Sequence, residues 1–210
     1  AVLIDGLTAA SDDAARITFL NAIHAVQRTH RDLEKPDEWD EVYAKLVAED
    51  ISAGVQIRAH GIAYLWGLEP AVETLYKQLY NLDATNSGVS LADRRLALSF
   101  LIQAADRSLP SFIDLFTDAK QEALLSDAVR GVAGLDNNDV AQKLIEIYGE
   151  LSPALRRDAL ATLSSRVNFA RMLLSAVRKN RIQRQDLMAD LVGQLRNRND
   201  DDLDGQIEAV

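Results

Sequence analysis

Three aspartates in the last part of the sequence have the spacing of a calcium-binding loop. Asp200, Asp202 and Asp204 alternate, and Gly205 and Ile207 follow at the sixth and eighth positions. An EF-hand loop requires alternating carboxylates, a glycine for its sharp turn and a bidentate glutamate at its twelfth position. That twelfth position is residue 211, after the last residue of the sequence. A calcium-binding unit is therefore one hypothesis for this segment.

The same segment also has the pattern of a helix. Leu203, Ile207 and Val210 lie at positions i, i+4 and i+7, which places them on one helical face. The aspartates before them would form an acidic first turn, which the helix dipole favours. We favour the helix and keep calcium binding as the alternative.

No other set of residues predicts a reaction centre or a cofactor site. The chain has no cysteine, so thiolate chemistry, Cys-ligated zinc and covalent haem attachment are excluded for these residues. The three histidines are His24, His30 and His60, and no two of them have the i, i+4 spacing of a helical zinc site. We interpret them as structural or surface histidines, and we expect the segment to be non-catalytic.

Charge is distributed unevenly along the chain, whose net charge is −9. Residues 1–151 have 13 basic and 24 acidic side chains, residues 152–198 have 10 and 3, and residues 199–210 have none and 5. The acidic whole disfavours nucleic acid as a partner. The basic segment is either a solvated helix face or a docking patch for an acidic partner. The candidate docking residues are Arg156, Arg157, Arg178, Lys179, Arg181 and Arg184.

The spacing of apolar residues predicts an all-α protein built from repeats. Apolar side chains recur every three or four residues, as in Leu155, Ala159 and Leu163, and strand-like alternation is lacking. Similar motifs return at a period of 31 residues, so that Ala97, Ala128 and Ala159 correspond. A fixed period of about 20 to 50 residues is typical of stacked helical repeats. We predict one α-solenoid domain over residues 1–210, with about six antiparallel helix pairs in a right-handed stack.

Prolines and capping residues set the predicted helix limits. The four prolines would begin helices, where the missing N–H has no cost, and Ser11-Asp12-Asp13 would cap the first long helix. A loop is expected over residues 81–88. The predicted pairs are 12–30 with 37–53, 55–67 with 70–80, 89–105 with 109–117, 120–134 with 137–149, 153–165 with 167–179, and 184–196 with 200–210. Residues 1–4 look like the middle of an element, so we expect a fragment of a longer protein.

The run of residues 151–166 (LSPALRRDALATLSSR), with weaker matches at 181–182, 194–196 and 203–210, resembles a known family. It is similar to the HEAT-like helical segment of the large multidomain haem-binding proteins of planctomycete bacteria. In that family the segment lies between a propeller similar to sugar dehydrogenases and a cytochrome-c-like module. The family's haem ligands have no counterpart here, so the resemblance implies no haem in this segment.

The resemblance implies a spacer and interaction module that holds neighbouring domains of an exported redox protein. Its location would be periplasmic or membrane-associated through the parent protein, without inserting in the membrane itself. The partners would be flanking domains or another protein, and no nucleic acid. The basic segment would steer an acidic partner onto the helical surface.

Overall fold

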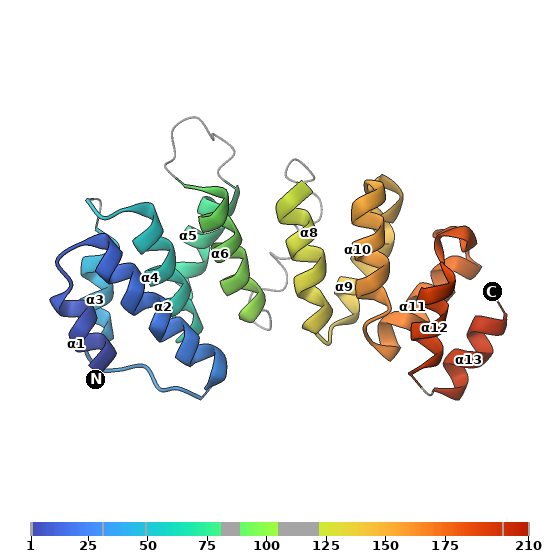
Figure 1. Cartoon of the computed structure of the whole chain (residues 1–210), viewed down its shortest axis with the longest axis horizontal. Helices are drawn as coiled ribbons and strands as arrows, with labels where there is room; N and C mark the ends of the chain where they lie inside the picture. Colours follow the sequence, from blue (N-terminus) through green and yellow to red (C-terminus); the bar gives the residue numbers. More distant parts are fainter. Residues whose placement is uncertain are drawn as a thin grey trace. The chain divides into compact units, whose positions relative to one another are not determined.

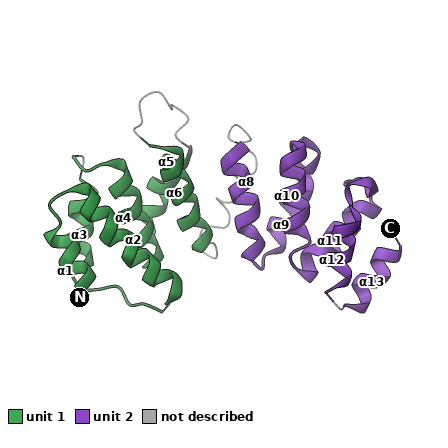
Figure 2. Ribbon diagram, in the orientation of Figure 1, with its two compact units in different colours: residues 1–108 green, residues 109–210 purple. Residues whose placement is uncertain are grey.

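The protein is described by a computed structural model that covers residues 2–30, 32–48, 50–80, 89–104, 122–198 and 200–209. These residues form twelve α-helices and no strand (Figure 1), which confirms the all-α prediction. The chain divides into two compact units, residues 1–108 and residues 109–210 (Figure 2). The single domain over 1–210 stays a prediction.

Helix α4 (Ala53–Leu65) is the centre of the first unit. It packs against α2, α3, α5 and α6, and most of its side chains are buried, from Val55 to Tyr64. A helix with apolar residues on most of its sides belongs inside a core, and α4 fits that rule apart from Gln56 and Arg58. The helices around it are α1 (Val2–Ala9), α2 (Asp13–Thr29), α3 (Trp39–Leu46), α5 (Pro70–Tyr80) and α6 (Leu91–Gln103).

In the second unit, helices pack mainly on the helix after next. The pairs α8–α10, α9–α11 and α11–α13 are in contact, and the sequential pairs α10–α11 and α12–α13 pack as well. Three short 3₁₀ turns, Val132–Gly134, Tyr148–Glu150 and Arg184–Asp186, connect helices. The helices are α8 (Glu122–Gly131), α9 (Asn138–Ile147), α10 (Pro153–Leu163), α11 (Val167–Arg178), α12 (Ala189–Arg196) and α13 (Asp201–Glu208).

Several predicted helix starts are confirmed at atomic detail. Asp12 caps α2 by accepting a hydrogen bond from the amide of Ala15 at 2.8 Å. Ser152 caps α10 in the same way, with Pro153 in the first turn where its missing N–H leaves no bond unmade. Helix α5 begins at Pro70.

Hydrogen bonds in the second unit join residues that are slightly more than one 31-residue sequence period apart. Thr162 Oγ1 donates to the carbonyl of Val129 at 2.7 Å, and Arg166 Nε donates to that of Ala133 at 3.1 Å. One repeat later, Arg198 Nη2 donates to the carbonyl of Ser164 at 2.9 Å. These partners are separated by 33 or 34 residues, so each side chain satisfies carbonyls near the end of the equivalent preceding helix.

The three alanines that recur every 31 residues in the sequence are buried in the structure. Ala97, Ala128 and Ala159 are 0%, 1% and 0% exposed, and each belongs to a helix that packs on a neighbour. The three corresponding alanines are therefore all core positions. Helices with small residues at the contact can lie closer together than helices with large ones.

Some predicted limits and pairings are wrong. Helix α3 covers 39–46 instead of 37–53, because the chain leaves the helix at Val47 and the next helix, α4, begins after Ser52. The predicted helix 184–196 is divided into a 3₁₀ turn and α12, since Tyr148 Oη holds Asp186 at 3.0 Å and Met188 is extended. No helix was predicted over residues 2–9, where the structure has α1. Helices α2 and α3, and likewise α8 and α9, pack mainly with other helices instead of with each other.

Other predictions fall on residues outside the described part of the chain. The predicted helix 109–117, the helix start at Pro110 and the loop 81–88 are in this group. None of the described helices has the length and apolar character to cross a membrane.

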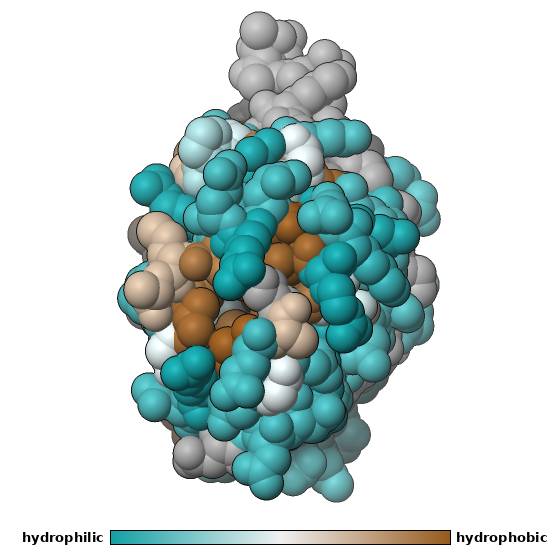
Figure 3. Space-filling model, turned by 90° about the vertical axis from the view of Figure 1, so that its right-hand side faces the viewer, coloured by the Kyte–Doolittle hydropathy of each residue, from teal (hydrophilic) through white to brown (hydrophobic). Residues whose placement is uncertain are grey.

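Helices α11, α12 and α13 share a small core at the end of the second unit. Ala170, Leu174, Leu195 and Leu203 are buried there. Leu187 and Ile207 pack against them and stay partly exposed. Figure 3 views the side on which the C-terminal helices lie and shows apolar surface framed by hydrophilic side chains.

Candidate functional site

Four of the six predicted docking residues follow one another at or shortly after the end of α11, whereas Arg156 and Arg157 are in the first half of α10. Arg178 is the last residue of α11, Lys179 caps it, and Asn180 has the left-handed φ of 56° that reverses the chain. The amide of Arg181 then bonds to the carbonyl of Ala176 at 2.9 Å, as in a Schellman-type helix end. Positive side chains at this end also interact favourably with the helix dipole.

Five of the six predicted docking cations are exposed and carry no ion pair. The exposed set is Arg157, Arg178, Lys179, Arg181 and Arg184. Within the described residues, no carboxylate lies within ion-pair distance of any of them, whereas Arg130 and Arg171 each hold an aspartate. Their positive charge is therefore available to an external acidic group.

Lys179 and Arg181 also line a small cavity between α9 and α11. Its volume is about 100 Å³, and Ile145, Met172 and Ala176 form its apolar part. Gln142 and Ser175 add polar atoms. A hollow of mixed polar and apolar lining that contains two cations suits a short side chain that ends in a carboxylate.

Arg156 differs from the other predicted docking residues. Its Nε donates to the carbonyl of Tyr148 at 3.2 Å, its Nη2 donates to that of Gly149 at 2.7 Å, and its guanidinium lies 5.6 Å from the centre of the Tyr148 ring. Tyr148 Oη in turn donates to Asp186 at 3.0 Å. Burial, and then the bond to Asp186, raise the pKa of Tyr148. Arg156 thus braces the turn between α9 and α10.

The three aspartates of the possible calcium loop lie on and before a helix. Asp200 caps α13 by accepting from the amide of Leu203 at 2.9 Å, which together with Arg171 lowers the pKa of Asp200. Arg171 Nη2 is 3.0 Å from Asp200, and its Nε is 3.0 Å from Asp202. Asp204 is inside the helix. The helical interpretation is confirmed, and two of the three carboxylates already hold an arginine.

Metal-ligand geometry is lacking across the described residues. No three His, Asp or Glu side chains are grouped there as a metal site requires.

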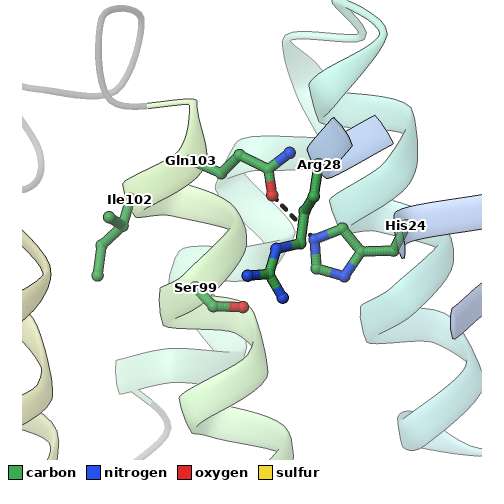
Figure 4. A pocket seen from close by; sticks show the side chains of 5 residues that line it. All are labelled: His24, Arg28, Ser99, Ile102 and Gln103. Atoms are coloured by element: carbon green, nitrogen blue, oxygen red, sulfur yellow. Dashed lines mark hydrogen bonds between the residues drawn. The ribbon is translucent and has the colours of Figure 1, made fainter. Parts of the chain in front are cut away.

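A second candidate site was not predicted. Helices α2 and α6 border an open groove of about 430 Å³, lined by His24, Arg28, Ser99, Ile102 and Gln103 (Figure 4). His24 Nε2 donates to Gln103 Oε1 at 2.9 Å. The His24 ring also lies against that of Phe100, with 4.2 Å between ring centres. Burial lowers the pKa of His24.

The sequence has only a faint signal for this groove. His24 and Arg28 are one turn apart on α2, and Ser99 and Gln103 are one turn apart on α6, so each pair shares a helical face. The two pairs are separated by about 70 residues in sequence. Nothing in their spacing indicates that they meet, and His24 was interpreted from the sequence as a structural or surface histidine.

The other two histidines have structural surroundings. His60 is 8% exposed, and its Nδ1 is 2.8 Å from Tyr43 Oη. Burial lowers the pKa of His60 to about 4. His30 is exposed and contacts the hydroxyl of the adjacent Thr29.

Comparisons with known proteins do not extend these observations. No protein-family model, curated protein or solved structure matches the chain.

Proposed function

We propose that this chain is a non-catalytic α-solenoid module whose basic surface docks an acidic protein segment. The solenoid is supported by the repeat period and by hydrogen bonds that join equivalent helices one period apart, such as Thr162 to Val129. A stack of helix pairs buries its seam between neighbours and leaves broad outer faces for binding. The proposed role of these outer faces is therefore binding and not catalysis.

The observation that carries the proposal is the group of unpaired cations at the end of α11. Residues 152–198 have a net charge of +7 in a chain whose net charge is −9. Arg178, Lys179 and Arg181 are exposed there and lack an acidic neighbour among the described residues. Such a concentration of charge attracts acidic partners and speeds their association.

The setting that we propose follows the family resemblance alone. In it the module is part of an exported redox protein, and its partner is a flanking domain or another protein. The module would hold that partner at a set distance and would bind no haem itself.

The test measures the binding of a fluorescent oligoglutamate peptide to the whole chain by anisotropy. We expect binding that weakens as salt rises from low to physiological strength, because exposed charges are screened over about 8 Å at 0.15 M. The triple variant R178E/K179E/R181E should lose most of the affinity. The single variants R178E and K45E are the matched pair, since each reverses one exposed cation and only Arg178 belongs to the docking group.

Two results would contradict the proposal. One is binding that does not depend on salt, and the other is equal affinity for the triple variant and the unaltered chain. Equal losses of affinity for K45E and R178E would also count against it, because they would show a general charge effect.

A further inference from the structure

We propose that the groove between α2 and α6 is a binding site for a small hydroxycarboxylate. This inference concerns the first unit and does not depend on the docking surface of the second. The groove volume of about 430 Å³ is in the range of small-molecule sites, which is roughly 300 to 1,000 Å³.

Arg28 supplies the charge that selects an anion. It is exposed on α2 and extends along the groove in the direction of α6 (Figure 4). The described lining of the groove contains no carboxylate, and no ion pair joins Arg28 to another described residue. A guanidinium presents two parallel N–H groups that match the two oxygens of a carboxylate.

The described lining of the groove carries a single positive charge, which favours a monoanion over a dianion. Gln103 Oε1 can only accept, so the hydrogen of its bond to His24 is on Nε2 of the imidazole. The depressed pKa keeps His24 neutral at pH 7, which leaves Nδ1 as an acceptor. Arg28 is then the only charged side chain of the described lining.

The remaining polar groups define the rest of the ligand. The Gln103 amide nitrogen is a further donor for a carboxylate oxygen. Ser99 Oγ donates to the carbonyl of Leu96 at 2.7 Å, so toward the groove it offers lone pairs. An acceptor there requires a donor on the ligand, and a hydroxyl beside the carboxylate provides one. A 2-hydroxycarboxylate matches this set of groups.

The groove is held in shape by the core beneath it. Phe100 is 0% exposed and supports the His24 ring from below. A Cβ at Gly61 of α4 would lie only 2.2 Å from the Phe100 ring, so this glycine allows the ring to pack directly on α4. The aromatic support and the bond to Gln103 together fix the orientation of His24, as a preformed site requires.

The test is an NMR titration of the whole chain with lactate, propionate and inorganic phosphate. We expect lactate to shift the ring signals of His24 and the side-chain amide of Gln103 with saturation. Propionate lacks the hydroxyl and should bind more weakly, and phosphate should bind more weakly still. The variant R28M should reduce lactate affinity by about tenfold or more, because a hydrogen bond to a charged group is lost.

Two further variants sharpen the test. S99A should weaken lactate binding and leave propionate binding unchanged, since only lactate donates to Ser99. K45M removes an exposed cation elsewhere in the first unit and should change neither affinity.

Three outcomes would overturn the proposal. They are the absence of a saturable shift at His24 with lactate, equal lactate affinity for R28M and the unaltered chain, and a preference for phosphate. The first is measured on the unaltered chain, so it decides the matter even where a variant fails to fold.

Discussion

Replacing Gly61 with alanine tests how closely α4 and α6 are packed. Gly61 is in the middle of α4, where alanine ordinarily improves a helix by up to about 1 kcal/mol. The structure reverses this expectation. An added Cβ would lie 2.2, 2.3 and 2.4 Å from three carbons of the Phe100 ring, far inside van der Waals contact.

The expected cost follows from how little room the ring has. Phe100 is 0% exposed and touches His24, so its ring cannot move into solvent. Overpacking of a core costs about 1–3 kcal/mol, and the gain in helix propensity offsets part of it. We expect Gly61→Ala to lower the free energy of unfolding by about 1–2 kcal/mol.

Gly54 of the same helix provides the matched control. A Cβ there would have its nearest neighbours at 3.6 Å, on Arg58 and Asp93, which is ordinary contact. Gly54→Ala should therefore stay within about 0.5 kcal/mol of the unaltered chain. Urea unfolding followed by tryptophan fluorescence is the assay, because both tryptophans, Trp39 and Trp66, are in the first unit. Equal stability of the two variants would refute the packing argument.

Three further predictions concern the side chains of His60, Thr162 and Arg156. Because burial lowers the pKa of His60 to about 4, only the unfolded chain binds that proton between pH 6.5 and pH 4. The free energy of unfolding should therefore fall by about 2 kcal/mol from pH 7 to pH 5 because of His60. Urea titrations at several pH values should show that His60→Gln makes this free energy depend less on pH over the same range. Thr162→Val should destabilise the second unit by about 1–2 kcal/mol in thermal unfolding, because the buried Val129 carbonyl loses its donor. Arg156→Met should cost about 1–2 kcal/mol of stability in urea and leave oligoglutamate affinity within about twofold, because its guanidinium bonds to backbone carbonyls.

The helical class and most helix starts could be predicted because they depend on local rules. Pro70 and Pro153 begin helices, and Asp12 and Ser152 cap them, through interactions within one turn. The interruption after Asp186 could not be predicted in this way. It depends on Tyr148, which is 38 residues earlier and reaches Asp186 only in the folded chain.

The same difference between local and long-range interactions decides which parts of the candidate sites could be predicted. The exposed cations near the end of α11 were predicted, since charge clustering is visible in one short segment. The different role of Arg156 was not, because its partners are backbone carbonyls that have no sequence signature. The groove was missed because His24 and Gln103 approach each other only when α2 and α6 both pack on α4.

A periodic sequence pattern predicts which residues are buried between helices better than it predicts which residues bind a ligand. Helix α6 is an example. Ala97, Leu98 and Phe100 are almost completely buried, while Ser99 between them is exposed in the groove. Buried side chains must have a suitable volume and spacing for the helices to pack, so the periodic pattern is found at these positions. An exposed position such as Ser99 is free of that constraint, and its residue type can instead be determined by the ligand that it binds. The functional residues of this fold are therefore to be sought among the positions that the period leaves unspecified.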